Sequence, residues 1–143
     1  MLVSACLLGI ACRYDGLSRP NPDVISLMDE YELIPFCPEI YGGLPTPRTP
    51  SEIVGDMVLM RDGKDVTPEY SRGAAEAVRI CKLLGIKKAC LKSKSPSCGV
   101  GLIYDGTFSH KLVEGYGITA RALADSGVLA FGENDLDRLK SKL

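Results

Sequence analysis

Hydrophobic and polar positions along this chain follow two periods, one typical of short strands and the other of helices. Short apolar runs predict strands at residues 1–5, 33–36, 86–92 and 128–131. Apolar positions at helical spacing, with suitable end signals, predict helices at residues 21–32, 67–84, 118–126 and 134–142. Helices that alternate with short apolar strands are typical of an α/β fold with a three-layer, mostly parallel, Rossmann-like sheet.

Turn-forming residues mark where two of these helices begin. Asn21 followed by Pro22 predicts the start of the first helix. Thr67 as the N-cap, followed by Pro68, predicts the start of the longest helix, and Gly85 predicts its end.

Segments rich in glycine and proline predict two hairpins and one long loop. The pairs Asp62-Gly63 and Asp105-Gly106 predict β-hairpins, with residues 57–60 facing 65–66 and residues 100–104 facing 107–108. Residues 38–55 contain several prolines and a pair of glycines, which favour an irregular loop. Loops of this length inside a compact domain usually carry function.

Length, charge and composition narrow the class of protein. The 143 residues are expected to form one α/β domain, 1–143, because 45% of them are hydrophobic and suffice for a core. The net charge of −1 gives no basic field, so we expect no macromolecular nucleic acid as a partner. No apolar run approaches the roughly 18 residues of a membrane helix, and the N-terminus does not resemble a signal peptide. We therefore expect a cytoplasmic protein without a membrane partner; the sequence predicts no oligomeric state.

The chain contains six cysteines, which in a cytosolic protein are more often metal ligands, catalytic groups or buried apolar residues than disulfides. Cys81 belongs to an apolar stripe of the longest helix and Cys90 lies in an apolar strand, so both are predicted to be core residues. The role of Cys12 stays open: it is a metal ligand, a reserve thiol or a packed residue. The single histidine excludes a zinc site of the Cys2His2 kind.

Three cysteines lie where a predicted strand gives way to a loop: Cys6, Cys37 and Cys98. Because parallel strands end at one edge of a sheet, where ligands bind, these thiols are expected to converge. Three thiolates suit an iron–sulfur cluster with one iron left open to a soft substrate atom. The alternative is three unrelated, half-buried thiols, since their spacing matches no iron–sulfur or zinc motif.

Polar residues near these cysteines are candidates for catalysis and binding. Glu39 follows Cys37 by two residues, and Ser95 precedes Cys98 by three. Beside a cluster, Glu39 would position or deprotonate a water, and Ser95 would hydrogen-bond that water or the substrate. Otherwise Glu39 is a solvated loop residue and Ser95 a turn residue. Arg48 is a candidate for binding a substrate carbonyl or an anionic group through its planar guanidinium.

The segments that carry these residues resemble a family of bacterial proteins. They are SACLLG at 4–9, CRYDG at 12–16, CPE at 37–39, GGLPTPR at 42–48, DVT at 65–67, LKSKSPSCG at 91–99 and YDGTF at 104–108. Their order over about residues 2–133 resembles domain-of-unknown-function family 523, whose characterised type is a thiouracil desulfidase.

The resemblance implies a 4Fe–4S cluster bound by Cys6, Cys37 and Cys98, with Glu39 and Ser95 as the catalytic pair beside the free iron. Cys12 stays open as an alternative ligand to Cys6. The implied activity is the non-redox, hydrolytic cleavage of a C–S bond in a small thiolated compound such as thiouracil. The implied partner is a small thiolated nucleobase or a similar substrate. The cluster is expected to be lost or replaced in samples prepared in air.

Two other functions fit the same residues. In the first, Cys12 closes a saturated zinc or cluster site, and the metal is structural in a non-catalytic module. In the second, one reactive thiolate relays a persulfide without any metal.

Overall fold

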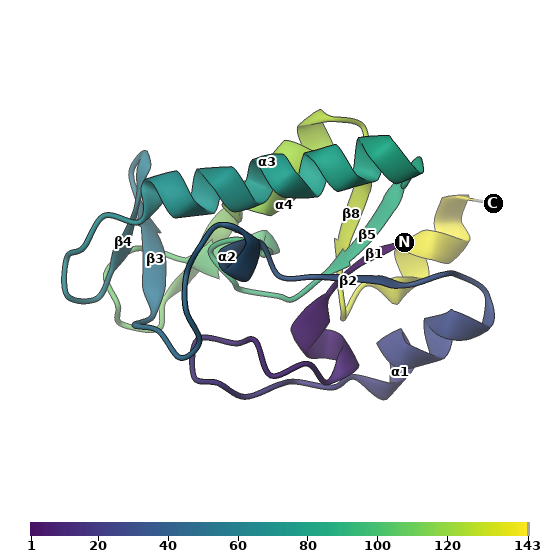
Figure 1. Ribbon diagram of the computed structural model, residues 1–143, viewed down its shortest axis with the longest axis horizontal. Coiled ribbons are helices and arrows are strands. Elements are labelled where there is room, and N and C mark those ends of the chain that lie inside the picture. Colours follow the sequence, from purple (N-terminus) through teal and green to yellow (C-terminus); the bar gives the residue numbers. More distant parts are fainter. Residues whose placement is uncertain (143) are drawn as a thin grey trace.

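Four short parallel strands form the sheet at the centre of the molecule (Figure 1). The structure is a computed structural model and describes residues 1–142. The sheet has the strand order β2-β1-β5-β8, and the strands are β1 (Leu2–Ser4), β2 (Ile34–Phe36), β5 (Lys88–Leu91) and β8 (Leu129–Gly132). Each neighbouring pair is parallel, so the predicted mostly parallel sheet is confirmed.

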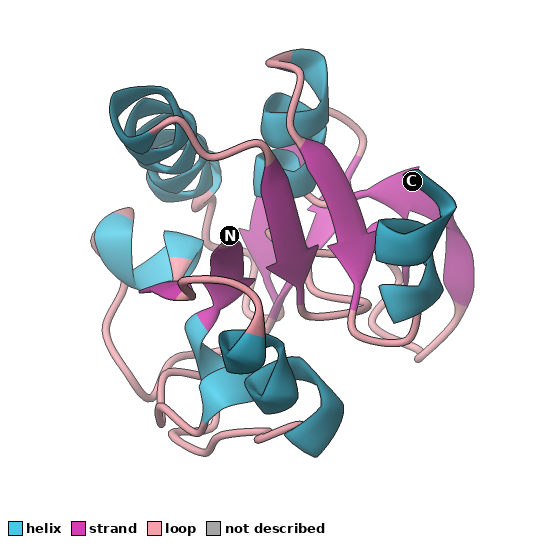
Figure 2. Cartoon of the chain, turned by 90° about the vertical axis from the view of Figure 1, so that its right-hand side faces the viewer, coloured by secondary structure: helices cyan, strands magenta, loops and turns pink. Residues whose placement is uncertain are grey.

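Helices cover both faces of this sheet (Figure 2). On one face lie α3 (Thr67–Leu84) and α4 (Ile118–Asp125), close to their predicted ranges. On the other lie α1 (Pro22–Ile25) and three 3₁₀ helices, η1 (Ala5–Leu8), η2 (Ser26–Asp29) and η3 (Leu136–Lys142). No helix among residues 1–142 is long and apolar enough to cross a membrane.

Strand residues alternate between the two faces and so build a core on each side of the sheet. Leu2 and Ala89 pack in the cluster that includes Ala77 of α3, whereas Val3 and Cys90 pack in the cluster on the opposite face. Both clusters are buried, as expected for a parallel sheet covered by helices.

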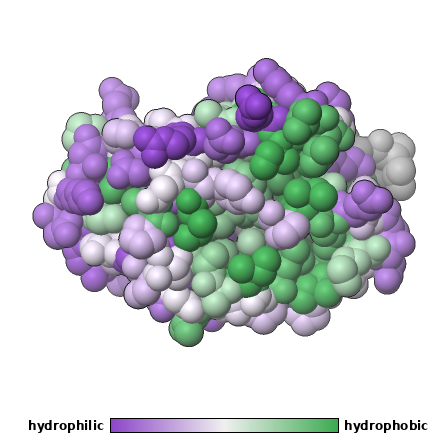
Figure 3. Space-filling model, in the orientation of Figure 1, coloured by the Kyte–Doolittle hydropathy of each residue, from purple (hydrophilic) through white to green (hydrophobic). Residues whose placement is uncertain are grey.

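Strand β2 forms one edge of the sheet. Hydrophobic side chains gather around its position on the face of the molecule shown in Figure 3. The strand contains Pro35, which has no amide hydrogen to offer to a further strand. Pro35 therefore limits pairing of this edge with another chain.

Two of the predicted helix starts have different outcomes. The Asn21 side chain accepts hydrogen bonds from the amides of Asp23 and Val24, at 3.0 and 3.2 Å, so its capping role is confirmed. The N-cap of α3 is Val66, and the prediction for Thr67 was wrong. The Thr67 hydroxyl instead accepts from the amide of Val58, at 2.8 Å, and ties the helix to a neighbouring strand.

The segment predicted as one long loop contains two regular elements. Pro38 opens a single helical turn, α2 (Pro38–Tyr41), because proline is compatible with the first turn of a helix. Strand β3 (Ser51–Val54) begins directly after the last proline of the segment. Only residues 42–50 between them are irregular.

Each predicted hairpin has its first strand in place, but that strand pairs mainly with a segment other than the predicted one. β4 (Met57–Met60) pairs with β3, and residues 65–66 add only an isolated bridge, between Leu59 and Asp65. β6 (Val100–Tyr104) pairs with β7 (Leu112–Tyr116), and residues 107–108 belong to the loop between them. Phe108 has a φ of 56°, a conformation that a strand cannot contain.

Candidate active site

A cavity of about 770 Å³ lies at the carboxyl ends of the strands of the central sheet. Its walls include residues that directly follow each strand: Ala5 after β1, Cys37 after β2, Lys92 after β5 and Glu133 after β8. The edge of the sheet that the sequence predicts for ligand binding therefore carries a cavity of a size that suits a small ligand.

Four of the six cysteines line this cavity, and they are Cys6, Cys12, Cys37 and Cys98. The other two do not. Cys81 and Cys90 are 3% and 0% exposed and pack on opposite faces of the sheet, which confirms their prediction as core residues. All six are free thiols.

The three cysteines predicted as ligands come from different elements. Cys6 is the second residue of η1, which begins directly after β1 ends. Cys37 is the N-cap of α2, between β2 and the helix. Cys98 lies in the turn that follows β5 and is 4% exposed.

Two cysteines of the cavity contact each other. Cys37 Sγ donates to the Cys12 carbonyl oxygen at 3.8 Å. The hydrogen bond to Cys12, together with burial, raises the pKa of Cys37 well above that of an ordinary thiol. Burial raises the pKa of Cys98 to about 12. A metal that binds these sulfurs must therefore displace protons from them.

The thiols of the cavity are the donor type that an iron–sulfur cluster needs. Within residues 1–142, no group of three or more His, Cys, Asp or Glu side chains is close enough to hold one metal ion. The donors are all sulfur, which is the ligand type of iron–sulfur clusters and does not suit hard cations. The residues present therefore fit a cluster by their chemistry.

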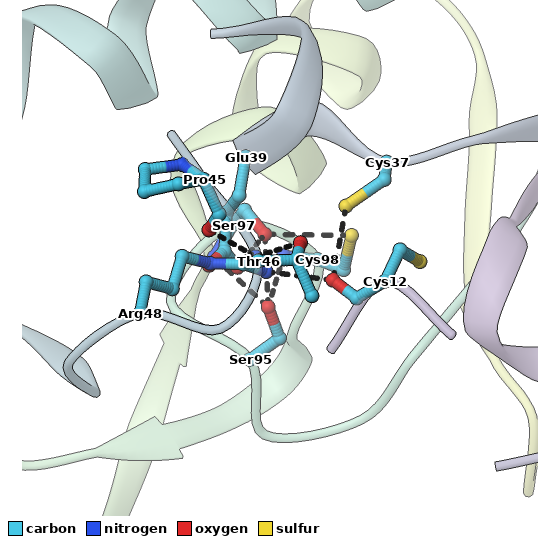
Figure 4. A network of polar contacts seen from close by, with 9 residues as sticks. All are labelled: Cys12, Cys37, Glu39, Pro45, Thr46, Arg48, Ser95, Ser97 and Cys98. Atoms are coloured by element: carbon cyan, nitrogen blue, oxygen red, sulfur yellow. Dashed lines mark hydrogen bonds and ion pairs between the residues drawn. The ribbon is translucent and has the colours of Figure 1, made fainter. Parts of the chain in front are cut away.

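Glu39 points toward Arg48 and Ser97 in the same network (Figure 4). Arg48 Nε donates to Glu39 Oε1 at 2.8 Å, and the Ser97 hydroxyl donates to Oε2 at 2.9 Å. The two side chains of the ion pair are only 4% (Arg48) and 13% (Glu39) exposed. Each carboxylate oxygen thus has a partner that fixes its position.

Arg48 ties the irregular loop to the rest of the site. Its Nη1 donates to the Pro45 carbonyl at 3.1 Å and to Thr46 Oγ1 at 3.0 Å, and its Nη2 donates to the Cys12 carbonyl at 2.9 Å. Four of its five N–H groups are engaged in this way. Binding of substrate by Arg48 stays a prediction, and only one N–H is left for it.

Ser95 is linked to Glu39 by Ser97, a residue that the sequence analysis did not single out. Ser95 Oγ is 2.9 Å from Ser97 Oγ, which in turn donates to Glu39. The only sequence signal for Ser97 is its hydroxyl between Pro96 and Cys98 in the turn that carries Ser95.

The turn that holds Ser95, Ser97 and Cys98 is fixed against α4. The Pro96 carbonyl accepts from the amide of Ile118 at 2.9 Å, and the Ser97 carbonyl accepts from the amides of Thr119 and Ala120 at 2.9 and 3.1 Å. A Cβ on Gly117 would lie 2.5 Å from the Ser97 carbonyl carbon. Only glycine allows this approach, so the turn and the helix have one relative position.

The position of α2, and with it Glu39, depends on a second close approach. A Cβ on Gly42 would lie 2.0 Å from the Glu69 carbonyl oxygen, and a Cβ on Gly73 would lie 2.0 Å from the Pro38 carbonyl oxygen. The two backbones therefore touch where α2 crosses α3.

These features define an α/β protein with a cysteine-lined cavity, the candidate active site, at the carboxyl ends of a parallel sheet. The sequence profile of the 2-thiouracil desulfurase family matches residues 1–135. The chain belongs to this family of enzymes, and the resemblance seen in its sequence is confirmed.

Two relatives match almost the whole chain. The uncharacterized protein YbbK of Bacillus subtilis (strain 168) is 40% identical over 147 residues, which cover 96% of this chain and 97% of YbbK. The solved structure of the 4Fe–4S-dependent thiouracil desulfidase TudS is 44% identical and superimposes with a TM-score of 0.93. The match covers 99% of this chain and 95% of that one.

Proposed function

We propose that this protein is a desulfidase that uses a 4Fe–4S cluster to remove sulfur from a small thiolated compound such as thiouracil, without net redox change. The observation that carries the proposal is the cavity that joins cysteines from three strand ends to the Glu39–Ser97–Ser95 chain. Its support from relatives is membership of the 2-thiouracil desulfurase family and 44% identity to the 4Fe–4S-dependent TudS.

The cluster is assigned to Cys6, Cys37 and Cys98, and Cys12 remains the fourth thiol of the cavity. Bound there, the cluster would supply a Lewis acid for the soft sulfur of the substrate and would so polarise the C–S bond. The same location at strand ends leaves the open cavity for the substrate.

Glu39 and Ser95 are assigned to the hydrolytic half of the reaction. The Glu39 carboxylate, held by Arg48, accepts a proton from the water that attacks the thiocarbonyl carbon. Ser95 orients that water or the substrate by hydrogen bonding. The C–S bond breaks, sulfur leaves as hydrosulfide, and the carbon keeps the oxygen of water, so that no electron is gained or lost overall.

A cytoplasmic location also belongs to the proposal. All six cysteines are free, which suits a reducing compartment where thiols and clusters persist.

Glu39→Ala, reconstituted anaerobically, tests the proposed chemistry. We expect its iron and sulfide content to equal that of the wild type, because Glu39 supplies no sulfur. Sulfide release from 2-thiouracil should fall by about 10²- to 10⁴-fold, the usual contribution of a positioned general base. Sulfide and uracil are measured against time, and thiolated nucleosides are offered as further substrates.

Glu114→Ala is the matched control, since Glu114 is an exposed carboxylate of β7. It should retain both cluster and rate. Full turnover by cluster-loaded Glu39→Ala removes Glu39 from the mechanism. A wild-type protein that carries the cluster and releases no sulfide from any thiolated base or nucleoside contradicts the proposed function itself.

A further inference from the structure

Ser97 lies between the two side chains assigned to the hydrolysis. It is 1% exposed, its hydroxyl donates to Glu39 Oε2 at 2.9 Å, and its Oγ is 2.9 Å from Ser95 Oγ. Figure 4 shows Ser97 close to Glu39, with Ser95 on the other side of the network. Ser97 is thus the only link described between Glu39 and Ser95 within residues 1–142.

The direction of this chain of hydrogen bonds follows from counting donors and acceptors. Ser95 Oγ accepts from the amides of Ser97 and Cys98, each at 3.1 Å, and these fill the two acceptor positions of a hydroxyl. Its remaining hydrogen bond must be a donated one, to Ser97 Oγ. The single proton of Ser97 is in turn directed to Glu39 Oε2 at 2.9 Å, which is much closer than the other acceptor of this hydroxyl, Cys98 Sγ at 3.6 Å. The chain therefore runs from Ser95 through Ser97 to Glu39.

Ser97 and Arg48 hold the Glu39 carboxylate from its two ends. Arg48 Nε occupies Oε1, and the Ser97 hydroxyl occupies Oε2, so that rotation of the carboxylate would break one of the two bonds. Ser97 is itself immobilised, because its carbonyl oxygen accepts from the amides of Thr119 and Ala120. Removal of its hydroxyl frees one oxygen of Glu39 and one proton of Ser95 at the same time.

We propose that Ser97 is a positioning residue that fixes Glu39 and Ser95 relative to each other and acts on the hydrolysis through them. The inference rests on the proposed function, in which these two groups handle the attacking water. Ser97 needs no contact with the substrate for this role.

Ser97→Ala tests the role, with Ser126→Ala as its control. Ser126 follows the last residue of α4, it is not among the residues that line the cavity, and its hydroxyl donates to the Leu123 carbonyl oxygen at 2.8 Å. Both variants are loaded with iron and sulfide anaerobically and assayed with 2-thiouracil, with rates expressed per cluster. We expect Ser97→Ala to lose about 10- to 100-fold in kcat, the range for a hydrogen bond to a charged group, with KM within about threefold of the wild type. Ser126→Ala should stay within about twofold of the wild type in both kcat and KM.

Double variants separate positioning from a merely structural effect. If Ser97 acts through Glu39 and Ser95, then Glu39→Gln with Ser97→Ala should be no slower than Glu39→Gln alone. The same holds for Ser95→Ala with Ser97→Ala. Multiplicative losses in both pairs, or a Ser97→Ala enzyme with wild-type kcat, overturn the inference.

A second readout is independent of turnover. In the metal-free protein, the unfolding free energies of Ser97→Ala, Glu39→Gln and the double variant form a cycle, and a hydrogen bond between the two side chains makes the losses non-additive. Additive losses overturn the assignment of Ser97. Coupling in this cycle, combined with a loaded wild type that releases no sulfide, means that the proposed function has failed and the placement of Ser97 has not.

Discussion

Individual residues in this protein have roles that depend on which other residues surround them. Cys90 and Cys98 are both buried, yet Cys98 lines the cavity and Cys90 packs between sheet and helices. Arg48 is charged, yet it is almost fully buried, because Glu39 and three backbone or side-chain oxygens accept its hydrogen bonds. The identity of the residue alone decides neither case.

Cys90 gives the folded protein a dependence on alkaline pH. Burial, and then the negative charge of Glu133, raises its pKa from 9.0 to about 12. Because the folded pKa is the higher one, the stabilisation is complete below pH 9 and is lost as the pH rises toward 12. Between these values the unfolded state has released a proton that the folded state still holds, which costs up to about 1.4 kcal/mol per pH unit.

Urea unfolding of the wild type and Cys90→Ala at pH 8, 9.5 and 11 measures this effect. The variant should be less stable at pH 8, because it leaves a small cavity, and the gap should narrow as the pH rises. A gap that stays constant from pH 8 to 11 contradicts the raised pKa of this thiol.

At the scale of elements, the crossing of α2 and α3 controls where Glu39 lies. Gly73→Ala should destabilise the protein by about 1–3 kcal/mol, because the new Cβ meets the Pro38 carbonyl oxygen. In an ordinary helix interior the same change would be stabilising by up to about 1 kcal/mol, so the sign of the effect is diagnostic.

Thermal or urea unfolding of Gly73→Ala measures that sign, with Ser71→Ala at an exposed position of the same helix as the control. Ser71→Ala should be neutral or slightly stabilising. A gain in stability for Gly73→Ala would mean that the two backbones separate easily, and that their contact does not fix α2.

The elements also differ in how far local sequence predicts them. α3 matches its prediction over its whole length, because its apolar stripe, Pro68 and Gly85 all favour the same helix. The turn α2 was missed because one helical turn is too short to show a period, and because Pro38 is read as a breaker although it occupies the first turn. The partner of β4 was missed because strand pairing is set by contacts beyond the turn sequence.

The site was only partly predictable for the same reason. Cysteines at strand ends can be recognised locally, since each follows an apolar run, and all three line the cavity. The contact between Ser97 and Glu39 joins residues 58 positions apart, and no local pattern records it. The roles of Cys6, Cys37, Cys98, Glu39, Ser95 and Arg48 in binding and catalysis remain predictions.

At the scale of the whole molecule, the topology of the sheet gathers residues that are distant in the chain. β1 lies between β2 and β5, so the segments that follow these three strands are neighbours at one edge. The fourth thiol of the cavity, Cys12, arrives differently, on the loop after η1. The three predicted ligands follow three adjacent strands, whereas Cys12 follows none of them, so substitutions of the single thiols can separate the proposed cluster from its alternatives.

Removal of single cysteines tests this arrangement. After anaerobic reconstitution, Cys6→Ala, Cys37→Ala and Cys98→Ala should each lose most of the iron and sulfide and the visible absorption of the cluster, whereas Cys12→Ala should keep them. Cys81→Ala is the control for a buried cysteine outside the cavity. A colourless protein with one zinc that needs Cys12 would favour a structural metal site, and a single essential cysteine with no metal would favour a persulfide relay.

The close contacts of Gly42 and Gly73 with their neighbouring carbonyls make one part of the surroundings of the cavity intolerant of substitution. Where α2, which contains Glu39, crosses α3, neither glycine can gain a Cβ unless one of the two helices moves. Within residues 1–142, the hairpin on another side of the cavity has no such contact with the central sheet. The walls formed by Tyr104 and His110 come from the β6–β7 hairpin and its loop, outside the central sheet. Directed evolution of an enzyme that accepts bulkier thiolated compounds should therefore randomise this hairpin and keep Gly42 and Gly73 unchanged.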